Sequence, residues 1–192
     1  MSPASPRRRA DDAFWRDSLR RYARPGVADA CLALQDAHGA DVNLVLWCCW
    51  LGSQGHRLDA RTLRRAVRAV AAWQSEVVQP LRGVRRVLKP CDGLGPAAAL
   101  RARVAALELR AEHHEQQILG RLAQALPAPG RRAEPDGAAA ANLARYLAFL
   151  GVPGDAAGRA AGVLLAPRAR SPAPPAHRRH TRHPSSPATT AA

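Results

Sequence analysis

Apolar residues recur along this chain at intervals of three and four, which is the spacing of one face of an α-helix. Aspartates precede several of these stretches and can cap a helix, while glycine or proline follows them. No stretch shows the alternating β-branched residues of a strand. The pattern predicts an all-α fold, a compact bundle of about six helices with a disordered C-terminal tail. The predicted helices span residues 11–23, 25–38, 41–52, 59–89, 96–126 and 136–150.

The stretch from Asp41 to Gly52, "DVNLVLWCCWLG", contains eight consecutive apolar residues. A helix needs about 20 apolar residues to span a bilayer, and shorter runs are typical of buried helices. The stretch therefore predicts no membrane span. Because it is apolar nearly all round, it predicts a central helix that the others cover.

A heptad pattern runs through the predicted helix at 59–89, broken only by Gln74. Gln74 either sets the register of a dimer or meets a buried polar group, and the pattern alone leaves both open. Pro80 is expected to kink or split this helix, because proline lacks an N–H and clashes with the preceding turn. The seam positions are Leu63, Val67, Val70, Gln74, Val77, Leu81, Val84 and Leu88.

The opposite face of the same helix is strongly basic and is the candidate anion-binding face. It has no acidic residue three or four positions away, so it is expected to attract phosphates or another acidic surface without sequence specificity. The alternative is a solvated face that pairs with the Glu108–Glu115 stretch of the next helix. The residues of this face are Arg61, Arg64, Arg65, Arg68, Arg82, Arg85, Arg86 and Lys89.

The predicted helix at 96–126 carries the "EHHE" stretch, which raises the possibility of a metal site. Glu108, Glu112 and Glu115 share helical spacing, with His114 beside them. The histidines do not fit the Glu-x-x-His pattern of carboxylate-bridged metal bundles. The simpler interpretation is a solvated acidic stripe and a core histidine. The inner face is predicted at Leu100, Val104, Leu107, Ala111, His114, Ile118 and Leu122.

Other candidate chemistry is weaker, so no catalytic, cofactor or metal residue is assigned. Cys48 and Cys49 are adjacent and lack Cys-x-x-Cys spacing, which favours core packing. His177, His180 and His183 have metal-like spacing but lie in a segment of biased composition.

The formal net charge of +14 is uneven along the chain. We expect a flexible basic arm at residues 1–10, a helical domain at 11–152, and a Pro/Ala/Arg/His-rich tail at 153–192 that is disordered from about 167. The first residues lack the apolar stretch of a secretory signal. The cysteines suit a reducing compartment, so a cytoplasmic location is expected.

Four segments resemble a family of small, all-helical proteobacterial proteins that is catalogued as a conserved domain of unknown function. They are "FWRDSLRRYARPGVADACLALQDAHGADVNLVLWCCWLG", "VVQPLRGVRRVLK", "LRARVAALELRAE" and "NLARYLAFLGV". The resemblance covers nearly all of residues 13–152. It implies a helical fold and a bacterial cytoplasm, and it brings no catalytic residue with it.

These observations favour a helical interaction module that binds an unknown protein partner and has no catalytic activity. The first alternative is non-specific binding of nucleic acid or an acidic surface through the basic face. The weaker alternative is a metal-binding helical protein centred on Glu108, Glu112, Glu115 and His114.

Overall fold

The computed structural model describes residues 6–91, 95–128 and 135–166. Every regular element in these ranges is helical, which confirms the all-α prediction. The elements are α1 (Pro6–Tyr22), α2 (Val27–His38), α3 (Val42–Ser53), α4 (Ala60–Trp73), a π turn η1 (Gln74–Val78), α5 (Gln79–Val87), a 3₁₀ turn η2 (Lys89–Cys91), α6 (Gly95–Gln124), α7 (Pro135–Phe149) and α8 (Gly154–Leu164).

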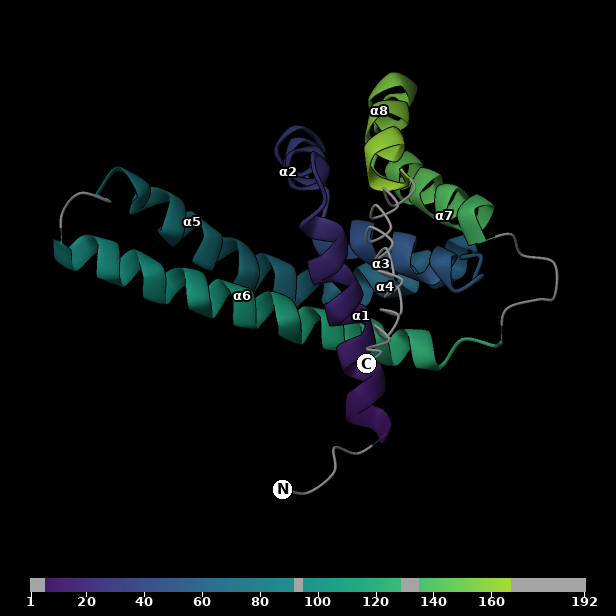
Figure 1. Cartoon of the computed structure of the whole chain (residues 1–192), viewed down its shortest axis with the longest axis horizontal. Helices are drawn as coiled ribbons and strands as arrows, with labels where there is room; N and C mark the ends of the chain where they lie inside the picture. The colour runs from purple at the N-terminus through teal and green to yellow at the C-terminus, as the bar shows by residue number, and fades with distance from the viewer. Residues whose placement is uncertain (1–5, 92–94, 129–134, 167–192) are drawn as a thin grey trace, which may run out of the picture.

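Helix α3 lies at the centre of the fold, where α1, α2, α6 and α7 all pack against it (Figure 1). Asp41 caps this helix by accepting hydrogen bonds from the backbone N–H groups of Asn43 (2.8 Å) and Leu44 (3.4 Å). Trp47 is fully buried, and its indole N–H donates to the carbonyl of Leu119 (3.1 Å). The predicted central helix is confirmed. In the part of the chain that the structure describes, no helix combines the length and hydropathy needed to cross a membrane.

Helices α4 and α5 form one continuous rod that the π turn η1 interrupts. The backbone N–H of Gln79 donates to the carbonyl of Gln74, five residues earlier, directly before Pro80. Proline has no N–H to donate and crowds the carbonyl of the preceding turn, and the wider turn accommodates it. The predicted interruption at Pro80 is therefore confirmed, and it takes the form of a π turn.

The π turn also changes which side chains of the rod face inward. It contains one residue more than an α turn, so it rotates the following helix by about 100°. Leu63 and Val70 are buried in α4. An unbroken heptad pattern would therefore place Val77 and Val84, two heptads later, on the inward side as well. The structure instead buries Val78 and leaves Val84 48% exposed. The predicted seam is correct for α4 and wrong by one residue in α5.

At the N-terminus, α1 begins at Pro6, five residues before the predicted cap at Asp11. Residues 6–10, predicted to be part of a flexible arm, therefore belong to the first helix.

The C-terminal boundary predicted at residue 153 is too early. Helix α8 packs against α2, with Ala160 and Leu164 buried, and the Arg24 guanidinium donates to the carbonyl of Leu164 (3.5 Å). The sequence missed this helix because alanine and glycine make up most of it and leave little hydrophobic periodicity. The tail predicted to be disordered from about 167, with His177, His180 and His183, lies outside the described residues.

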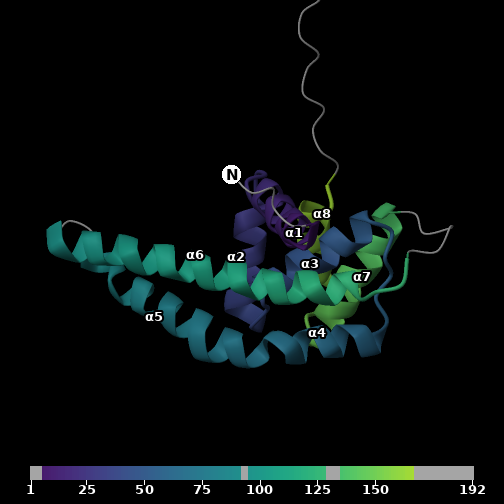
Figure 2. The same cartoon turned by 90° about the horizontal axis from the view of Figure 1, so that it is seen from below.

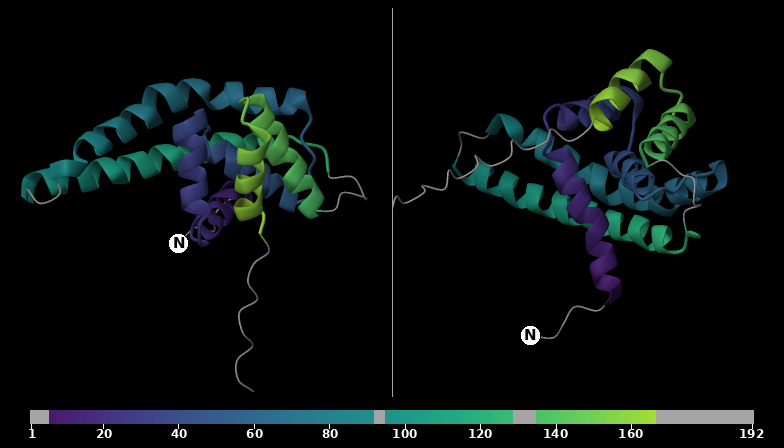
Figure 3. Two further views of the ribbon diagram at one scale, coloured as in Figure 1. Left: turned by 90° about the horizontal axis from the view of Figure 1, so that it is seen from above. Right: turned by 45° about the vertical axis from the view of Figure 1, so that its right-hand side comes forward.

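Two helices project from the body as a hairpin (Figures 1 and 2). We call α5, η2 and the N-terminal half of α6, residues 79–91 and 95–110, the hairpin arm. Its helices run side by side away from α1, α2, α7 and α8, as the further views also show (Figure 3). The bundle is thus a compact body around α3 with one extended arm.

We predict that Gly52→Ala destabilises the fold by about 3 kcal/mol, because α3 and α7 meet without room for a side chain. A Cβ at Gly52 would lie 2.1 Å from the Cα of Ala139, and backbone atoms cannot move aside as a side-chain tip can. Gly83→Ala in α5 is the matched control, since a Cβ there meets nothing within 4 Å. It should stabilise the protein by about 0.5–1 kcal/mol through helix propensity. Urea unfolding measures both, and equal effects of the two changes would contradict the close approach.

Candidate functional site

The inward face of α6 carries carboxylates as well as apolar residues. Val104, Glu108, Ala111, Glu115 and Leu119 follow one another at intervals of three and four, and all are buried. Glu108 is 5% exposed and Glu115 is 0% exposed, so the predicted solvated acidic stripe is wrong for both. Among the predicted inner positions, Val104 and Ala111 are buried and Ile118 and Leu122 pack against the core, whereas Leu100, Leu107 and His114 are exposed.

Two arginines of α5 neutralise the N-terminal part of this face. The Arg82 guanidinium donates to Glu108 (Nε to Oε1, 3.1 Å) and to Glu112 (Nη2 to Oε1, 2.7 Å). Arg85 donates to both carboxylate oxygens of Glu108. Arg82 also donates to the side-chain oxygen of Gln35 in α2, which ties the base of the arm to the body. These charge-assisted bonds join the two helices of the arm near residue 108.

The pKa values of the glutamates follow from this arrangement. Burial alone would raise the pKa of Glu108, but hydrogen bonds from Arg85 and Arg82 outweigh it and hold that pKa below its ordinary value. For Glu112, burial prevails over the attraction of Arg82 and raises the pKa.

The eight residues of the candidate anion-binding face occupy different settings. The four on α4 are exposed, and so is Lys89. Arg86 is exposed and pairs with Asp36 of α2 (2.8 Å). Arg82 and Arg85 instead turn toward α6, because the π turn rotates α5 relative to α4. The face that the sequence pattern joined is thus divided at residue 74. The α4 residues are Arg61, Arg64, Arg65 and Arg68.

The C-terminal part of the acidic face meets the cap of α3. Glu115 and Asp41 lie together, and neither oxygen of Glu115 nor Oδ2 of Asp41 finds an existing N–H or O–H donor. Burial, with the negative charge of Asp41 second, raises the pKa of Glu115 to about 10, and burial also raises the pKa of Asp41. One carboxyl group of the pair therefore keeps its proton near neutral pH and donates it to the other.

Polar side chains from α3, α6 and α7 surround this carboxyl pair. The Gln116 amide donates to Oδ1 of Asn43 (2.8 Å), and the Tyr146 hydroxyl accepts a hydrogen bond from the backbone N–H of Asp41 (2.9 Å). Burial raises the pKa of Tyr146 far above its ordinary value, so the phenol stays neutral. Sequence reasoning missed this cluster. The signal that pointed to it was the pair of polar residues, Asp41 and Asn43, at the start of an otherwise apolar helix.

The two histidines of α6 face aromatic rings. His113 stacks on Trp15 of α1, and His114 lies against Trp73 of α4, each with 4.5 Å between ring centroids. His114 is exposed, so its prediction as a core histidine is wrong. Within the described ranges, no three His, Cys, Asp or Glu side chains are grouped to hold a metal ion.

Cys31, Cys48 and Cys49 are free and buried. Burial raises the pKa of Cys31 to about 12 and that of Cys49 to about 11, so these thiols stay protonated. They act as small apolar residues of the core, as the sequence predicted.

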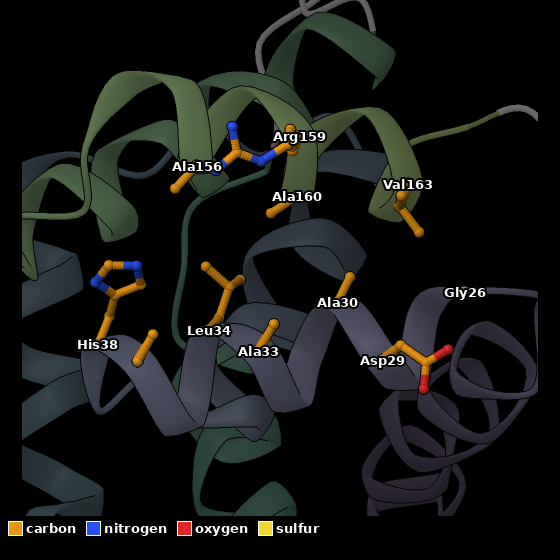
Figure 4. Close-up of a pocket in the computed structure, with 11 residues that line it drawn as sticks. Gly26, Asp29, Ala30, Ala33, Leu34, His38, Ala156, Arg159, Ala160 and Val163 are labelled. Atoms are coloured by element: carbon orange, nitrogen blue, oxygen red, sulfur yellow. The ribbon is translucent and has the colours of Figure 1, made fainter.

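A shallow groove of about 450 Å³ separates α2 from α8 (Figure 4). Alanines from both helices form its floor, while His38, Asp29 and Arg159 lie around its edge. Arg159 pairs with Asp155 of its own helix (2.8 Å). The lining residues therefore lack the convergent polar groups that orient a small-molecule ligand.

The fold and the polar cluster define an all-helical protein with a buried carboxyl network and a projecting hairpin. The chain belongs to the family described as "Protein of unknown function (DUF2390)", whose model matches residues 13–119. The match begins in α1 and ends within α6, so it includes the carboxyl network of α6 and the cap of α3, whereas α7 and α8 lie beyond it. Neither the curated proteins nor the solved structures include a match to the chain.

We predict that Arg82→Met destabilises the protein by about 3 kcal/mol, because it leaves buried carboxylates with one cation fewer. The side chains of Arg82 and Glu108 are 12% and 7% exposed. Arg64→Met is the matched control, since Arg64 is exposed and makes no ion pair with a described residue. It should change the free energy of unfolding by less than about 0.5 kcal/mol. Chemical denaturation near pH 7 compares the free energies of unfolding of the two variants. Equal losses of stability would refute the division of the basic face.

We predict that Glu115→Gln stabilises the protein progressively as pH rises. With its pKa at about 10, Glu115 is protonated in the native protein and ionised in the unfolded chain above its ordinary pKa of 4.5. The native state then binds one more proton, so the free energy of unfolding of the wild type falls with rising pH through this window. The free energy of unfolding of the variant should rise relative to that of the wild type by about 1 kcal/mol per pH unit between about pH 6 and pH 9.

Glu76→Gln is the control for this measurement, because Glu76 is an exposed glutamate in the π turn. It should keep a constant difference from the wild type across the same pH range. A pH-independent difference for Glu115→Gln as well would show that the carboxyl pair shares no proton.

Proposed function

We propose that this protein is a helical interaction module, without catalytic activity, that binds a protein partner through the hairpin arm. The observation that carries this proposal is the exposure of apolar side chains on the arm. Val84, Leu100 and Leu107 are each about half exposed, and Val87 is 76% exposed. Isolated exposed leucines are normal on protein surfaces, but a group of them on one projecting element is typical of an interaction site.

The way in which the arm is held together supports this proposal. Ion pairs from Arg82 and Arg85 to Glu108 help to join its two helices, and while Val104 is buried on the inward face of α6, Val84, Leu100 and Leu107 stay about half exposed. A helix normally buries its apolar stripe against a neighbour. In the arm, α5 and the first half of α6 run beside each other (Figures 1 and 3), and Arg82 and Arg86 of α5 also contact α2 near the base. A partner that covers them would bury the area that the fold leaves open.

A cytoplasmic location fits the free, buried cysteines of the core, because thiols stay reduced there. These cysteines and the family resemblance support the proposal of a bacterial cytoplasmic location.

A tagged full-length chain, purified from its own cells after nuclease treatment, should retain a protein partner in stoichiometric amount. Leu100→Gln/Leu107→Gln should lose that partner, because the change removes apolar area and adds no charge. Leu19→Gln/Leu32→Gln is the matched control, since these leucines are 48% and 41% exposed on α1 and α2, outside the arm. Failure to recover a partner, or equal retention by both variants, would refute the module.

A second candidate function is binding of a polyanion by the exposed arginines of α4. Arg64 and Arg145 of α7 line opposite sides of one shallow groove, which extends the basic surface beyond α4. The same purification without nuclease tests this candidate, because nucleic acid should then be recovered in a salt-sensitive manner. Replacement of Arg61, Arg64, Arg65 and Arg68 by glutamine should abolish that recovery, whereas the protein partner should remain.

A further inference from the structure

One face of the hairpin arm alternates leucine and arginine along α6. Leu100, Arg103, Leu107 and Arg110 follow one another at intervals of three and four, so they lie along one side of the helix. All four are exposed, and neither arginine makes an ion pair with a described residue. The two arginines are seven residues apart, a rise of about 10 Å along the helix.

Helix α5 adds apolar residues to the same face. Leu81 precedes the inward Arg82, and Val84 precedes the inward Arg85, just as Leu107 precedes the inward Glu108. The two helices are antiparallel and right-handed. The residue that directly precedes an inward residue therefore points toward the same face of the pair on both helices. The leucines of α6 and the apolar residues of α5 therefore lie on one face of the hairpin arm, with arginines on its α6 edge. We call it the Leu–Arg face.

We infer that the Leu–Arg face docks an amphipathic helix of a partner protein, with its apolar residues against the leucines and its acidic residues placed on Arg103 and Arg110. This inference rests on the proposed interaction module and adds the chemistry of its partner. A helix laid on this face completes a three-helix packing and covers Leu100 and Leu107. Carboxylates at a spacing of about two turns meet the two arginines with charge-assisted hydrogen bonds.

Charge favours this occupant over a second copy of the chain. A symmetric pair of arms would bring two cationic faces together, and the like charges repel. The site of the apolar residues favours a helix over a lipid surface. Insertion into a membrane requires a row of apolar side chains that points outward from the protein. The apolar residues of this face instead flank the contact between the two helices, and they include Leu81, Val84 and Leu107.

The first experiment identifies the occupant by cross-linking. A photoreactive phenylalanine analogue replaces Val87, which is 76% exposed on α5 one turn after Val84, in the full chain expressed in its own cells. The control places the same analogue at exposed Ser53, at the end of α3. Mass spectrometry of the adduct at residue 87 should show a protein segment with net negative charge and apolar residues at heptad spacing. Adducts to a second copy, lipid, nucleic acid or a basic or neutral segment, or none above the control, would overturn the inference.

The second experiment tests the arginines with the cross-linked segment as a synthetic peptide. Arg103→Glu/Arg110→Glu should weaken its binding to the purified chain about tenfold or more. A peptide with lysine in place of its acidic residues should recover that loss, and a mere structural defect would not respond in this way. Arg61→Glu/Arg68→Glu is the matched control, because these residues are equally spaced and exposed on α4. Equal weakening by both variants, or no recovery, would reject the Leu–Arg face.

The two proposals fail in different ways. If a partner requires Leu100 and Leu107 but binds through a basic or neutral segment, the proposed interaction module stands and the inferred acidic chemistry of the partner is wrong. Absence of any partner removes both.

Discussion

The burial of carboxylates on α6 is the constraint on which the rest of this structure depends. A buried, unpaired carboxylate costs several kcal/mol, so each one requires a cation, a donor or a proton. Toward the N-terminal half of α6, arginines of α5 form ion pairs with Glu108 and Glu112. Further along, Glu115 meets Asp41, and the pair is stabilised by a retained proton. Polar contacts, together with the apolar core, therefore set the positions of α5, α3 and α7 relative to α6.

The π turn before Pro80 makes the first of these contacts possible. Without the rotation it introduces, the inward positions of α5 would be apolar and the arginines would continue the outer face of α4. With it, the helices of the arm join through ions, and apolar side chains such as Val84 remain half exposed. The usual division, in which apolar residues bind the neighbouring helix and charges face solvent, is partly reversed in the arm. This reversal is the physical basis of the proposed interaction surface.

The body and the arm thus have different roles. The body is closed around α3, where Trp47, Cys31 and Cys49 are buried and the raised pKa values of the two thiols keep them protonated. The arm extends from this support, and Arg82 anchors its base to Gln35 of α2. A rigid, anchored hairpin loses little conformational entropy when it binds, which favours recognition by a preformed surface.

The sequence by itself determined the helical class, the central place of α3, the cap at Asp41 and the interruption at Pro80, because each depends on local pattern and backbone chemistry. It also revealed that the α4–α5 rod is basic. Only the tertiary structure decided that Arg82 and Arg85 turn inward, that Glu115 is buried and that α8 covers α2. A one-residue rotation reverses inside and outside without altering composition, and the partner of a buried charge lies on another helix. Neither can be read from one segment of the chain.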